Sequence, residues 1–419
     1  MFIATGPVAP LFKGFFMMSD PVSIVLVGIG GYGGTYCHLL LNDKQSRGKI
    51  VGVVDPFAEK AQFFSELKKR KIPFYDTLAE FYTQHTADLA ILSTPISLHS
   101  RQTCEALEHG SHVLCEKPLC AHPAEAAAML AAQRKSGLLV AIGYQWSFCS
   151  AIQSLKADIL DGRLGRPVQF KTLVLWPRTD TYYARNNWAG AMKNADGDWV
   201  YDSPANNACA HYLHNMLYLA GSSPEKSVLP VRMQAELYRA NPISNYDTAA
   251  FRITTQDGPE ILFYTTHASS RTLGPIFKYT FEEATVEFSG RGGDIVATFA
   301  NGQQKNYGNP DQDGVEEKLW GTIRAIRGDG SILCGIEASM KQTLCIYAAT
   351  LSCPAIRSFP CDLVYKAGVP GNQVRVMTGL AELLEKAYLE SALPAEISNA
   401  FWLNPGKSVP VPMTAVIPQ

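Results

Sequence analysis

Short apolar runs alternate with more polar stretches through the first third of the chain. The runs lie at 24–27, 50–54, 89–92, 113–114 and 138–142. Continuous apolar runs of this length are typical of parallel strands that are buried on both faces. The stretches between them, such as the one from about Thr35 to Asn42, have helical character. Repetition of strand, helix and strand predicts a doubly wound parallel sheet with right-handed crossovers.

The pattern changes from about residue 143 onward, where candidate strands alternate apolar and polar positions. These strands lie at 169–175, 231–238, 249–254, 261–266, 277–281 and 285–288. After residue 230 they follow one another directly, which predicts a large, mostly antiparallel sheet. Helices are predicted near 313–327, 335–352 and 374–390. We therefore expect an α/β chain with an extended or disordered arm at 1–20, a Rossmann domain at 21–145, an α+β domain at 146–400 and an extended tail at 401–419.

Charge and composition exclude several classes of function. The 419 residues include 37 Lys+Arg and 38 Asp+Glu, for a net charge of -1. This balance, without a basic block, argues against nucleic acid or an anionic membrane as a partner. No apolar run reaches the roughly 18 residues of a membrane span. The ten scattered cysteines lack a CxxC pair, which favours reduced thiols in a cytoplasmic protein, and no metal site is expected.

A glycine-rich turn directly after the first apolar run carries the first chemical signal. It reads Gly28-Ile29-Gly30-Gly31-Tyr32-Gly33, and Asp55 follows the second run. In this context the three motif glycines allow a tight turn, close approach to a pyrophosphate, and close packing of helix on strand. The helix N-terminus attracts the phosphates. Asp55 can accept hydrogen bonds from the adenosine ribose, and Pro56 and Phe57 offer no cation for a 2′-phosphate, so NAD is favoured over NADP.

Lys117 is the second chemical signal. It lies in Glu116-Lys117-Pro118, just after an apolar run and thus at the carboxyl edge of the expected sheet. Open α/β sheets bind their ligands at this edge. Beside an oxidised nicotinamide, the ammonium form of Lys117 would be disfavoured by the like charge. The side chain could then polarise a substrate hydroxyl or take part in a proton relay.

Four segments of the chain resemble the Gfo/Idh/MocA family of NAD(P)-dependent sugar oxidoreductases, which includes glucose–fructose oxidoreductase and inositol dehydrogenase. They are GIGGYG (28–33), DLAILSTPISLHS (88–100), EHGSHVLCEKPL (108–119) and AHYLHNMLYLAG (210–221). The resemblance implies a catalytic Lys117 at the nicotinamide end of the site, and cofactor contacts from Ser93, Thr94, Pro95 and Glu116. His99 either contacts the cofactor or helps to close a helix end. The family's substrate domain has an open sheet face that often forms dimers or tetramers.

The family's second motif is Asp-x-x-x-His on a helix, and Asn207 and His211 occupy the matching positions. His211 is the natural general base for a hydroxyl proton. Asn207 is a departure, because an amide can orient a hydroxyl but cannot ionise. Asp202, just upstream, could supply the missing charge. His214 also departs from the pattern and could contact substrate or be a satisfied core residue.

Aromatic and cationic residues cluster between the two motifs. They are Tyr144, Trp146, Trp176, Arg178, Tyr182, Tyr183, Arg185, Asn187 and Trp188. Sugars present flat C–H faces and rings of hydroxyls, which such side chains suit. Of these, Tyr144, Trp146, Arg178, Tyr183 and Trp188 are the candidate substrate contacts, alongside Lys117, His211 and His214. Packing between domains is the alternative, but the bunching at 176–188 favours a substrate wall or a lid.

Three functions are compatible with these features. The leading hypothesis is an NAD-dependent oxidoreductase acting on a secondary hydroxyl of a sugar, polyol or glycoside, with Lys117 and His211 managing its proton and Asn207 orienting its oxygen. The second is an enzyme that retains NAD and uses transient oxidation for elimination, epimerisation or glycoside cleavage. The third is a sensor that binds nucleotide and sugar without turnover. A homo-oligomer is expected from the resemblance.

Overall fold

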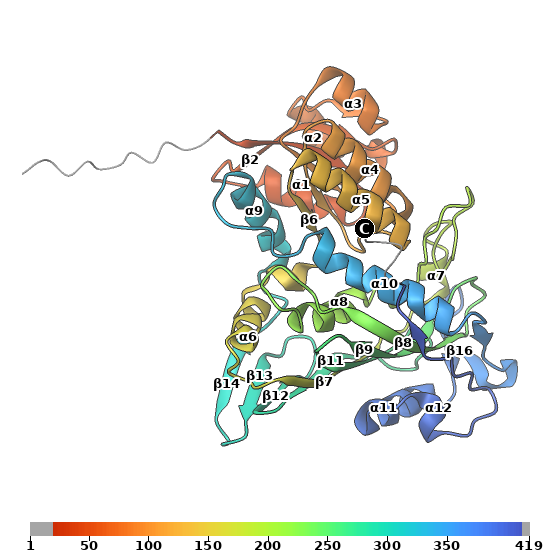
Figure 1. Cartoon of the computed structure of the whole chain (residues 1–419). Coiled ribbons are helices and arrows are strands. Elements are labelled where there is room, and N and C mark those ends of the chain that lie inside the picture. Colours follow the sequence, from red (N-terminus) through yellow and green to blue (C-terminus); the bar gives the residue numbers. More distant parts are fainter. Residues whose placement is uncertain (1–19, 413–419) are drawn as a thin grey trace, which may run out of the picture.

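The computed structural model describes residues 20–412, which form two large sheets and one small hairpin (Figure 1). The expected N-terminal arm, apart from Asp20, and residues 413–419 of the expected tail lie outside this described part. The hairpin consists of β16 (Val364–Val369) and β17 (Asn372–Met377). Within residues 20–412, no helix is both long and apolar enough to cross a membrane.

The first sheet has six strands in the order β3-β2-β1-β4-β5-β6, and every pair is parallel. Its strands are β1 (Val22–Val27), β2 (Gly48–Val54), β3 (Phe74–Tyr75), β4 (Leu89–Leu92), β5 (His112–Cys115) and β6 (Val140–Ile142). Its helices are α1 (Gly33–Leu41), α2 (Phe64–Lys69), α3 (Leu78–Gln84), α4 (Ile96–Glu108) and α5 (Pro123–Ser136). The predicted parallel sheet is confirmed. The strand order reverses between β1 and β4, so the carboxyl ends of these strands border a topological switch point.

The second sheet is mostly antiparallel, as predicted, and has ten strands. Their order is β14-β13-β12-β11-β7-β10-β9-β8-β15, with β18 added beside β8. The bounds are β7 (Pro167–Leu175), β8 (Pro230–Arg239), β9 (Thr248–Thr255), β10 (Glu260–Thr266), β11 (Leu273–Phe281), β12 (Ala284–Phe288), β13 (Ile295–Phe299), β14 (Gln304–Gly308), β15 (Arg357–Ser358) and β18 (Val409–Pro410). The β7–β10 and β8–β15 pairs are parallel. The described part of the expected tail therefore includes a paired strand.

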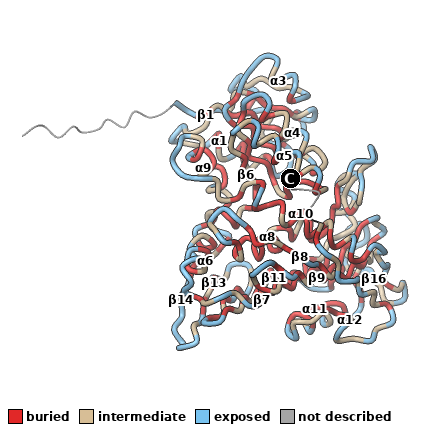
Figure 2. Tube along the Cα trace, in the orientation of Figure 1, coloured by how far each residue is buried: buried red, intermediate tan, exposed pale blue. Residues whose placement is uncertain are grey.

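Helices cover one face of the second sheet and part of the other, which the family resemblance implied to be open. The helices α6 (Ser150–Leu160), α8 (Ala210–Leu219) and α10 (Ile336–Ser352) pack on one face. On the other side, α11 (Leu380–Glu390) and α12 (Pro394–Ile397) lie below the sheet (Figure 1). The trace of α11 includes buried residues, among them Leu380 and Leu384 (Figure 2). Leu173 and Leu262 share a core there with Leu384. The chain's own C-terminal segment thus occupies part of the face expected for oligomer contacts.

The predicted helix at 374–390 begins too early. Residues 372–377 form β17, and α11 starts only at Leu380. Gly379, in the left-handed region at φ 74°, turns the chain between them. The β-branched Val374 and Val376 pair with β16, and this pairing overrides the helical reading of the segment.

The other helices near the C-terminus match the prediction, and α9 (Gly314–Ile326) has an unexpected position. It contacts β5 of the first sheet and the 3₁₀ turn Gln145–Phe148. A helix from the second half of the sequence therefore packs on the first half (Figure 1). The division at residue 145 remains a prediction.

Candidate active site

The glycine-rich turn has the geometry that a dinucleotide cradle requires. A Cβ on Gly33 would lie 2.0 Å from the carbonyl oxygen of Gly28, and a Cβ on Gly28 would lie 2.8 Å from that of Ser93. Gly28 is also at φ 79°, which favours glycine. By contrast, a Cβ on Gly30 would meet no atom within 4 Å. Gly28 and Gly33 thus hold the turn against α1 and β4, whereas Gly30 leaves open space beside its backbone.

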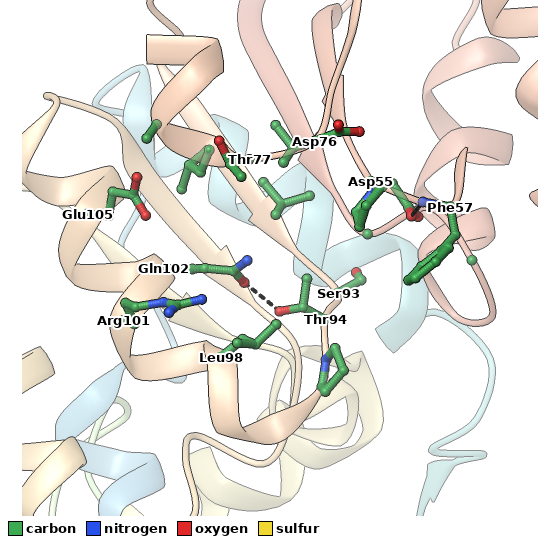
Figure 3. Close-up of a pocket in the computed structure, with 18 of the residues that line it drawn as sticks. Asp55, Phe57, Asp76, Thr77, Ser93, Thr94, Leu98, Arg101, Gln102 and Glu105 are labelled. Carbon is green, nitrogen blue, oxygen red and sulfur yellow. Dashed lines mark hydrogen bonds between the residues drawn. The ribbon is translucent and has the colours of Figure 1, made fainter. Parts of the chain in front are cut away.

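Asp55 closes one end of this cradle. Its carboxylate accepts hydrogen bonds from the backbone N–H groups of Ile29 (2.9 Å) and Phe57 (2.8 Å). Each carboxylate oxygen retains a lone pair that can accept from a ribose hydroxyl. Asp55 borders a cavity of about 870 Å³ between the glycine turn and α4 (Figure 3). Lys60 also lines this cavity, although the sequence reasoning considered only Pro56 and Phe57 for contact with a 2′-phosphate.

A second cavity of about 610 Å³ adjoins the first at the carboxyl ends of the strands. Gly30, Ser93, Thr94 and Pro95 line both cavities. The buried Ser93 hydroxyl has no hydrogen-bond partner among residues 20–412, so it is available to a ligand. The residues present therefore fit a dinucleotide, with Asp55 at the adenosine side and the second cavity at the nicotinamide side.

Lys117 lines the second cavity and is held by Asn207. Its Nζ donates to the backbone oxygen of Asn207 (2.9 Å) and to the side-chain oxygen of the same residue (3.2 Å). Burial lowers the pKa of Lys117, and the nearby Lys318 ammonium lowers it further, while Glu116 opposes the shift. The sequence reasoning attributed this shift to the nicotinamide, but the protein itself produces it through desolvation.

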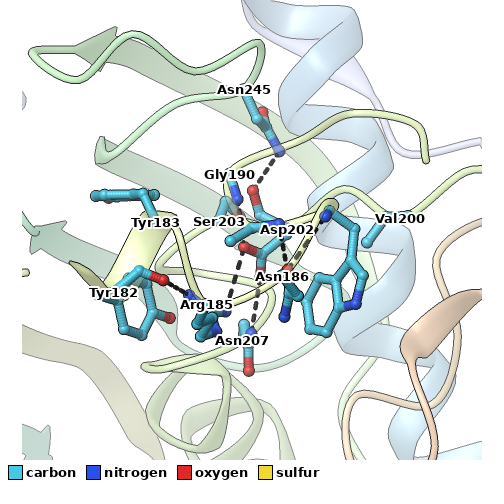
Figure 4. A network of polar contacts seen from close by, with 12 residues as sticks. Tyr182, Tyr183, Arg185, Asn186, Gly190, Val200, Asp202, Ser203, Asn207 and Asn245 are labelled. Carbon is cyan, nitrogen blue, oxygen red and sulfur yellow. Dashed lines mark hydrogen bonds and ion pairs between the residues drawn. The ribbon is translucent and has the colours of Figure 1, made fainter. Parts of the chain in front are cut away.

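Asn207 also contacts a buried carboxylate. Its Nδ2 donates to Asp202 Oδ1 at 2.7 Å, and Asp202 Oδ2 accepts from the Gly190 backbone N–H at 2.6 Å (Figure 4). Arg185 approaches the same carboxylate at 3.6 Å. Burial raises the pKa of Asp202 even though these donors and Lys117 lower it. Asp202, which the sequence suggests as a source of the missing charge, is therefore connected to Lys117 through Asn207.

Asn207 does not lie on the same helix as His211, contrary to the expectation from the motif. It belongs to the turns of residues 203–209, and α8 begins at Ala210. His211, in the first turn of α8, is half-buried and does not line the second cavity. Its Nδ1 is buried without a partner. Burial lowers the pKa of His211 well below its ordinary value, and the Lys117 charge acts in the same direction.

Three candidate substrate contacts are buried in the core. His214 stacks on Tyr144, with ring centroids 4.0 Å apart, and its Nε2 lies 3.1 Å from the Ser147 hydroxyl. Trp146 donates its indole N–H to Asp311 at 2.8 Å. His214, Tyr144 and Trp146 are at most 3% exposed, and none of them lines either cavity. Their positions match the packing alternative.

Only some residues of the segment at 176–188 line the second cavity. Arg178, Tyr182, Arg185 and Trp188 line the second cavity. Tyr183 instead contacts His267, with its hydroxyl 3.0 Å from the ring Nδ1. The short helix α7 (Asp180–Tyr183) is joined to the β16–β17 hairpin by the hydroxyl of Thr181, which donates to Asn372. This segment forms one wall of the cavity.

His99 lies in the first turn of α4 and is buried. Its ring nitrogens lie 2.8 Å from the Pro118 carbonyl oxygen and 2.9 Å from that of Thr94. Although His99 is among the residues lining the second cavity, these contacts place it between the ends of β4 and β5. The geometry favours the reading in which His99 braces the chain at a helix end.

Lys318, on α9, is a buried residue next to the site that could not be predicted from the sequence. Its fully buried Nζ forms an ion pair with Glu116 and donates to the Tyr32 hydroxyl at 2.8 Å. The Tyr36 hydroxyl donates to the same Glu116 oxygen at 2.7 Å. Burial would raise the pKa of Glu116, but the Lys318 charge and these hydrogen bonds hold it below its ordinary value. No motif connects Lys318 to Glu116, so sequence carried no signal for this pair.

No group of His, Cys, Asp and Glu side chains between residues 20 and 412 is arranged to hold a metal ion. All ten cysteines, which lie in this range, are free thiols, and eight of them are buried.

Comparison with known proteins gives relatives that match part of this chain. A "2,7-anhydro-N-acetylneuraminate hydratase" of Mediterraneibacter gnavus is 24% identical over 208 residues, which is 49% of this chain and 51% of the relative. A "D-glucoside 3-dehydrogenase" of Escherichia coli is 29% identical over 154 residues, covering 36% of this chain and 42% of the relative. The chain thus spans about half or less of the length of these curated relatives.

Solved structures extend the likeness in fold to both sheets. The WlbA dehydrogenase from Bordetella pertussis, in complex with NADH and UDP-GlcNAcA, has a TM-score of 0.64 at 20% identity and covers 78% of this chain and 96% of its own. A putative NADPH-dependent oxidoreductase from Desulfitobacterium hafniense has a TM-score of 0.66 at 16% identity and covers 80% of this chain and 96% of its own.

The match to a family model covers the first sheet and its glycine turn. Residues 22–144 match the sequence model described as "Oxidoreductase family, NAD-binding Rossmann fold". This range contains the dinucleotide cradle, Asp55 and Lys117. Residues 22–144 therefore match the NAD-binding domain of the Gfo/Idh/MocA oxidoreductase family.

Proposed function

We propose that the protein transfers hydride between the nicotinamide of NAD and a secondary hydroxyl-bearing carbon of a sugar, polyol or glycoside. The observation that carries the proposal is the position of Lys117, which lines a cavity that shares Gly30 and Ser93 with the dinucleotide cradle. A reactive amine at the nicotinamide side of an NAD site is suited to the chemistry of a hydroxyl group.

The chain's own residues would hold NAD through the glycine turn, Asp55 and the Ser93 hydroxyl. When bound, NAD supplies the hydride acceptor for oxidation of the substrate carbon. The protein's task is then to orient the hydroxyl and to accept its proton as the carbon–oxygen double bond forms. In the reverse direction, the same groups return the proton to the carbonyl oxygen.

Lys117 and His211 are the two candidates for this proton. Lys117 lines the cavity, and its lowered pKa makes the neutral amine more accessible at neutral pH. The lowered pKa of His211 favours its neutral imidazole form. Asn207 positions Lys117 by accepting two hydrogen bonds from its Nζ. Its side-chain N–H donates to Asp202, so the carboxylate polarises the amide that binds Lys117.

The decisive experiment measures nicotinamide absorbance over sugars, polyols and glycosides, with NAD and NADP in separate series. We expect reduction of NAD, and we expect Lys117→Ala to retain NAD binding while losing turnover by 10²-fold or more. Protein that binds NAD but oxidises no member of the panel would refute the proposal. If Lys117→Ala also leaves the protein's cellular role unchanged, the sensor hypothesis replaces it.

A second candidate function is an enzyme that keeps NAD bound and oxidises its substrate only transiently. Two observations favour it: position 207 carries a neutral amide, and one relative is a hydratase by name. The measurement that separates the two functions is product formation without net accumulation of NADH. Stoichiometric NADH would exclude it.

Self-association and a cytoplasmic location remain parts of this proposal. Because α11 and α12 cover the sheet beside β7 and β10, a dimer would have to use another part of that face. Light scattering of the purified chain tests the oligomeric state.

A further inference from the structure

Arg178 is a cavity-lining cation without a carboxylate partner. It follows β7 and lines the second cavity together with Lys117. Among residues 20–412, no Asp or Glu oxygen lies within ion-pair distance of its guanidinium. Its neighbour Arg185, in contrast, pairs with Asp202. A guanidinium that faces a cavity in this way retains donors for an incoming anion.

Arg178 is held in place by contacts that leave most of its donors unused. Its backbone N–H donates to the His267 carbonyl at 3.1 Å, and Nη1 donates to the Pro177 carbonyl at 3.2 Å. The guanidinium carbon lies 5.5 Å from the Trp176 ring centroid and 5.1 Å from that of Tyr182. Two aromatic rings thus orient the planar group, the Tyr182 hydroxyl also accepts from it, and most of its five N–H donors remain for a ligand.

The charges around the cavity do not balance. Two buried carboxylates are present, and each has a cationic partner: Glu116 pairs with Lys318, and Asp202 pairs with Arg185. Within residues 20–412, Arg178 remains as a cation without a carboxylate, and Lys117 adds a further positive charge whenever it is protonated. The whole chain carries a net charge of -1, so this excess is local to the cavity. A cleft with one sign of charge attracts ligands of the opposite sign.

We propose, on the basis of the hydride-transfer function above, that the substrate carries an anionic group, a carboxylate or a phosphate, which Arg178 binds. The hydroxyl-bearing carbon then faces Lys117, and the anion lies toward the wall formed by residues 176–188. The phosphates of NAD do not require Arg178, because the glycine turn and the N-terminus of α1 offer backbone N–H donors to a pyrophosphate.

The test compares matched substrates with the whole protein and saturating NAD. Glucose, glucuronic acid and glucose 6-phosphate differ at one substituent, so they separate a neutral group, a carboxylate and a phosphate; galactose, galacturonic acid and galactose 1-phosphate form a second set. We expect kcat/KM to be at least tenfold higher for one anionic class than for its neutral counterpart. Arg178→Gln should remove this preference by raising KM at least tenfold, and Arg178→Lys should restore part of it.

Arg291→Gln is the matched control. The Arg291 guanidinium lies 4.5 Å from the ring centroid of the same Trp176, but the residue does not line the cavity. We expect this variant to retain the substrate preference. We also expect Arg178→Gln to bind NAD with unchanged Kd, since the inference assigns Arg178 to the substrate.

Three results would overturn the inference. They are equal use of neutral and anionic sugars, an unchanged KM of Arg178→Gln for the anionic sugar, and a loss of NAD affinity in that variant as large as its rise in KM. Failure of the proposed function gives a different result, in which NAD binds but no sugar of any charge is oxidised. In that case, calorimetric titration of the NADH complex with glucuronic acid and glucose 6-phosphate still decides the inference, because wild type should bind one of them and Arg178→Gln should not.

Discussion

The side chain of Asn207 donates a 2.7 Å hydrogen bond to the buried carboxylate of Asp202 and accepts from Lys117 through its oxygen. One amide therefore connects the cavity-lining amine to a carboxylate that does not itself line the cavity. The carboxylate expected at position 207 is absent from the motif, yet a carboxylate is present one hydrogen bond farther from Lys117. An amide can transmit polarisation in this way because its two ends bind as donor and acceptor.

Asp202→Asn should reduce kcat about tenfold or more with a smaller change in KM, because Asn207 would lose the charged acceptor that orients its amide. The pH–rate profile of the variant should also shift, since the Asp202 carboxylate opposes the lowering of the Lys117 pKa. Steady-state kinetics between pH 6 and 10 measure both effects. A variant with wild-type kcat and an unmoved profile would show that Asp202 serves only the fold.

Exchanging the two side chains provides a sharper form of this test. Asn207→Asp alone places two carboxylates in contact and should lower both activity and stability, since like charges at this distance cannot both ionise cheaply. In Asn207→Asp combined with Asp202→Asn, one amide and one carboxylate are again paired. We expect the double variant to recover much of the activity lost in Asn207→Asp. Recovery no better than the single variant would contradict the proposed connection.

Gly30→Ala should abolish NAD binding without unfolding the protein. A Cβ at Gly30 meets no protein atom within 4 Å, but it would stand where the backbone must approach the pyrophosphate. We expect Kd for NAD to rise at least 100-fold while Tm changes little. Gly34→Ala is the control, because its Cβ would lie 3.5 Å from the Phe63 ring, an ordinary contact, outside the cradle. Equal NAD affinity in both variants would exclude the assigned role of Gly30.

Lys318→Met should destabilise the protein by about 3–5 kcal/mol, because it leaves the Glu116 carboxylate buried without its cation. Adding Glu116→Gln removes the unpaired charge and should restore much of this loss. Urea denaturation of the two variants and wild type measures the difference. If the single and double variants are equally unstable, the ion pair is not the source of the effect.

Acid should destabilise the protein through His214. Burial lowers its pKa to about 3, whereas an unfolded histidine titrates near 6.5. Above pH 6.5 the His214 imidazole is neutral in both the folded and the unfolded state. Below pH 6.5 it becomes protonated in the unfolded chain but stays neutral in the folded protein. The free energy of unfolding should therefore fall by about 2 kcal/mol between pH 7 and pH 5 from this residue alone.

His214→Phe keeps a ring against Tyr144 and removes the titrating group. Its unfolding free energy should be about 2 kcal/mol less sensitive to the same change of pH. His211 and His267 also have lowered pKa values, so both proteins will still lose stability in acid. Identical pH dependence in wild type and His214→Phe would exclude the assignment.

The site residues that could be predicted from the sequence are those that directly follow a strand. The glycine turn, Asp55 and Lys117 lie at the ends of strands that their own apolar runs define, so their shared position at one sheet edge follows from topology. The antiparallel character of the second sheet was likewise readable from alternating positions. β13 and β14 were missed because their partly exposed positions carry a weaker pattern.

The remaining features depend on contacts between distant residues. Asn207 and His211 have the spacing of one helical face, but the helix begins after Asn207, and spacing alone does not reveal a boundary. His214 is a typical candidate for a site by residue type, yet α8 turns it into the core. Lys318 and Glu116 are 202 residues apart, and only the packing of α9 on β5 brings them together.

The place of α9 has a consequence for how the molecule is made. The nucleotide-binding half is first along the chain, but Glu116 meets its counter-ion only after another 202 residues have been added. A nascent chain released or cleaved before Lys318 would have to leave this carboxylate hydrated or protonated, which is incompatible with its buried final position. The strands of the first sheet are therefore synthesised early, but the helix that neutralises Glu116 follows much later. Burial of Glu116 in the first half of the chain therefore depends on the second half.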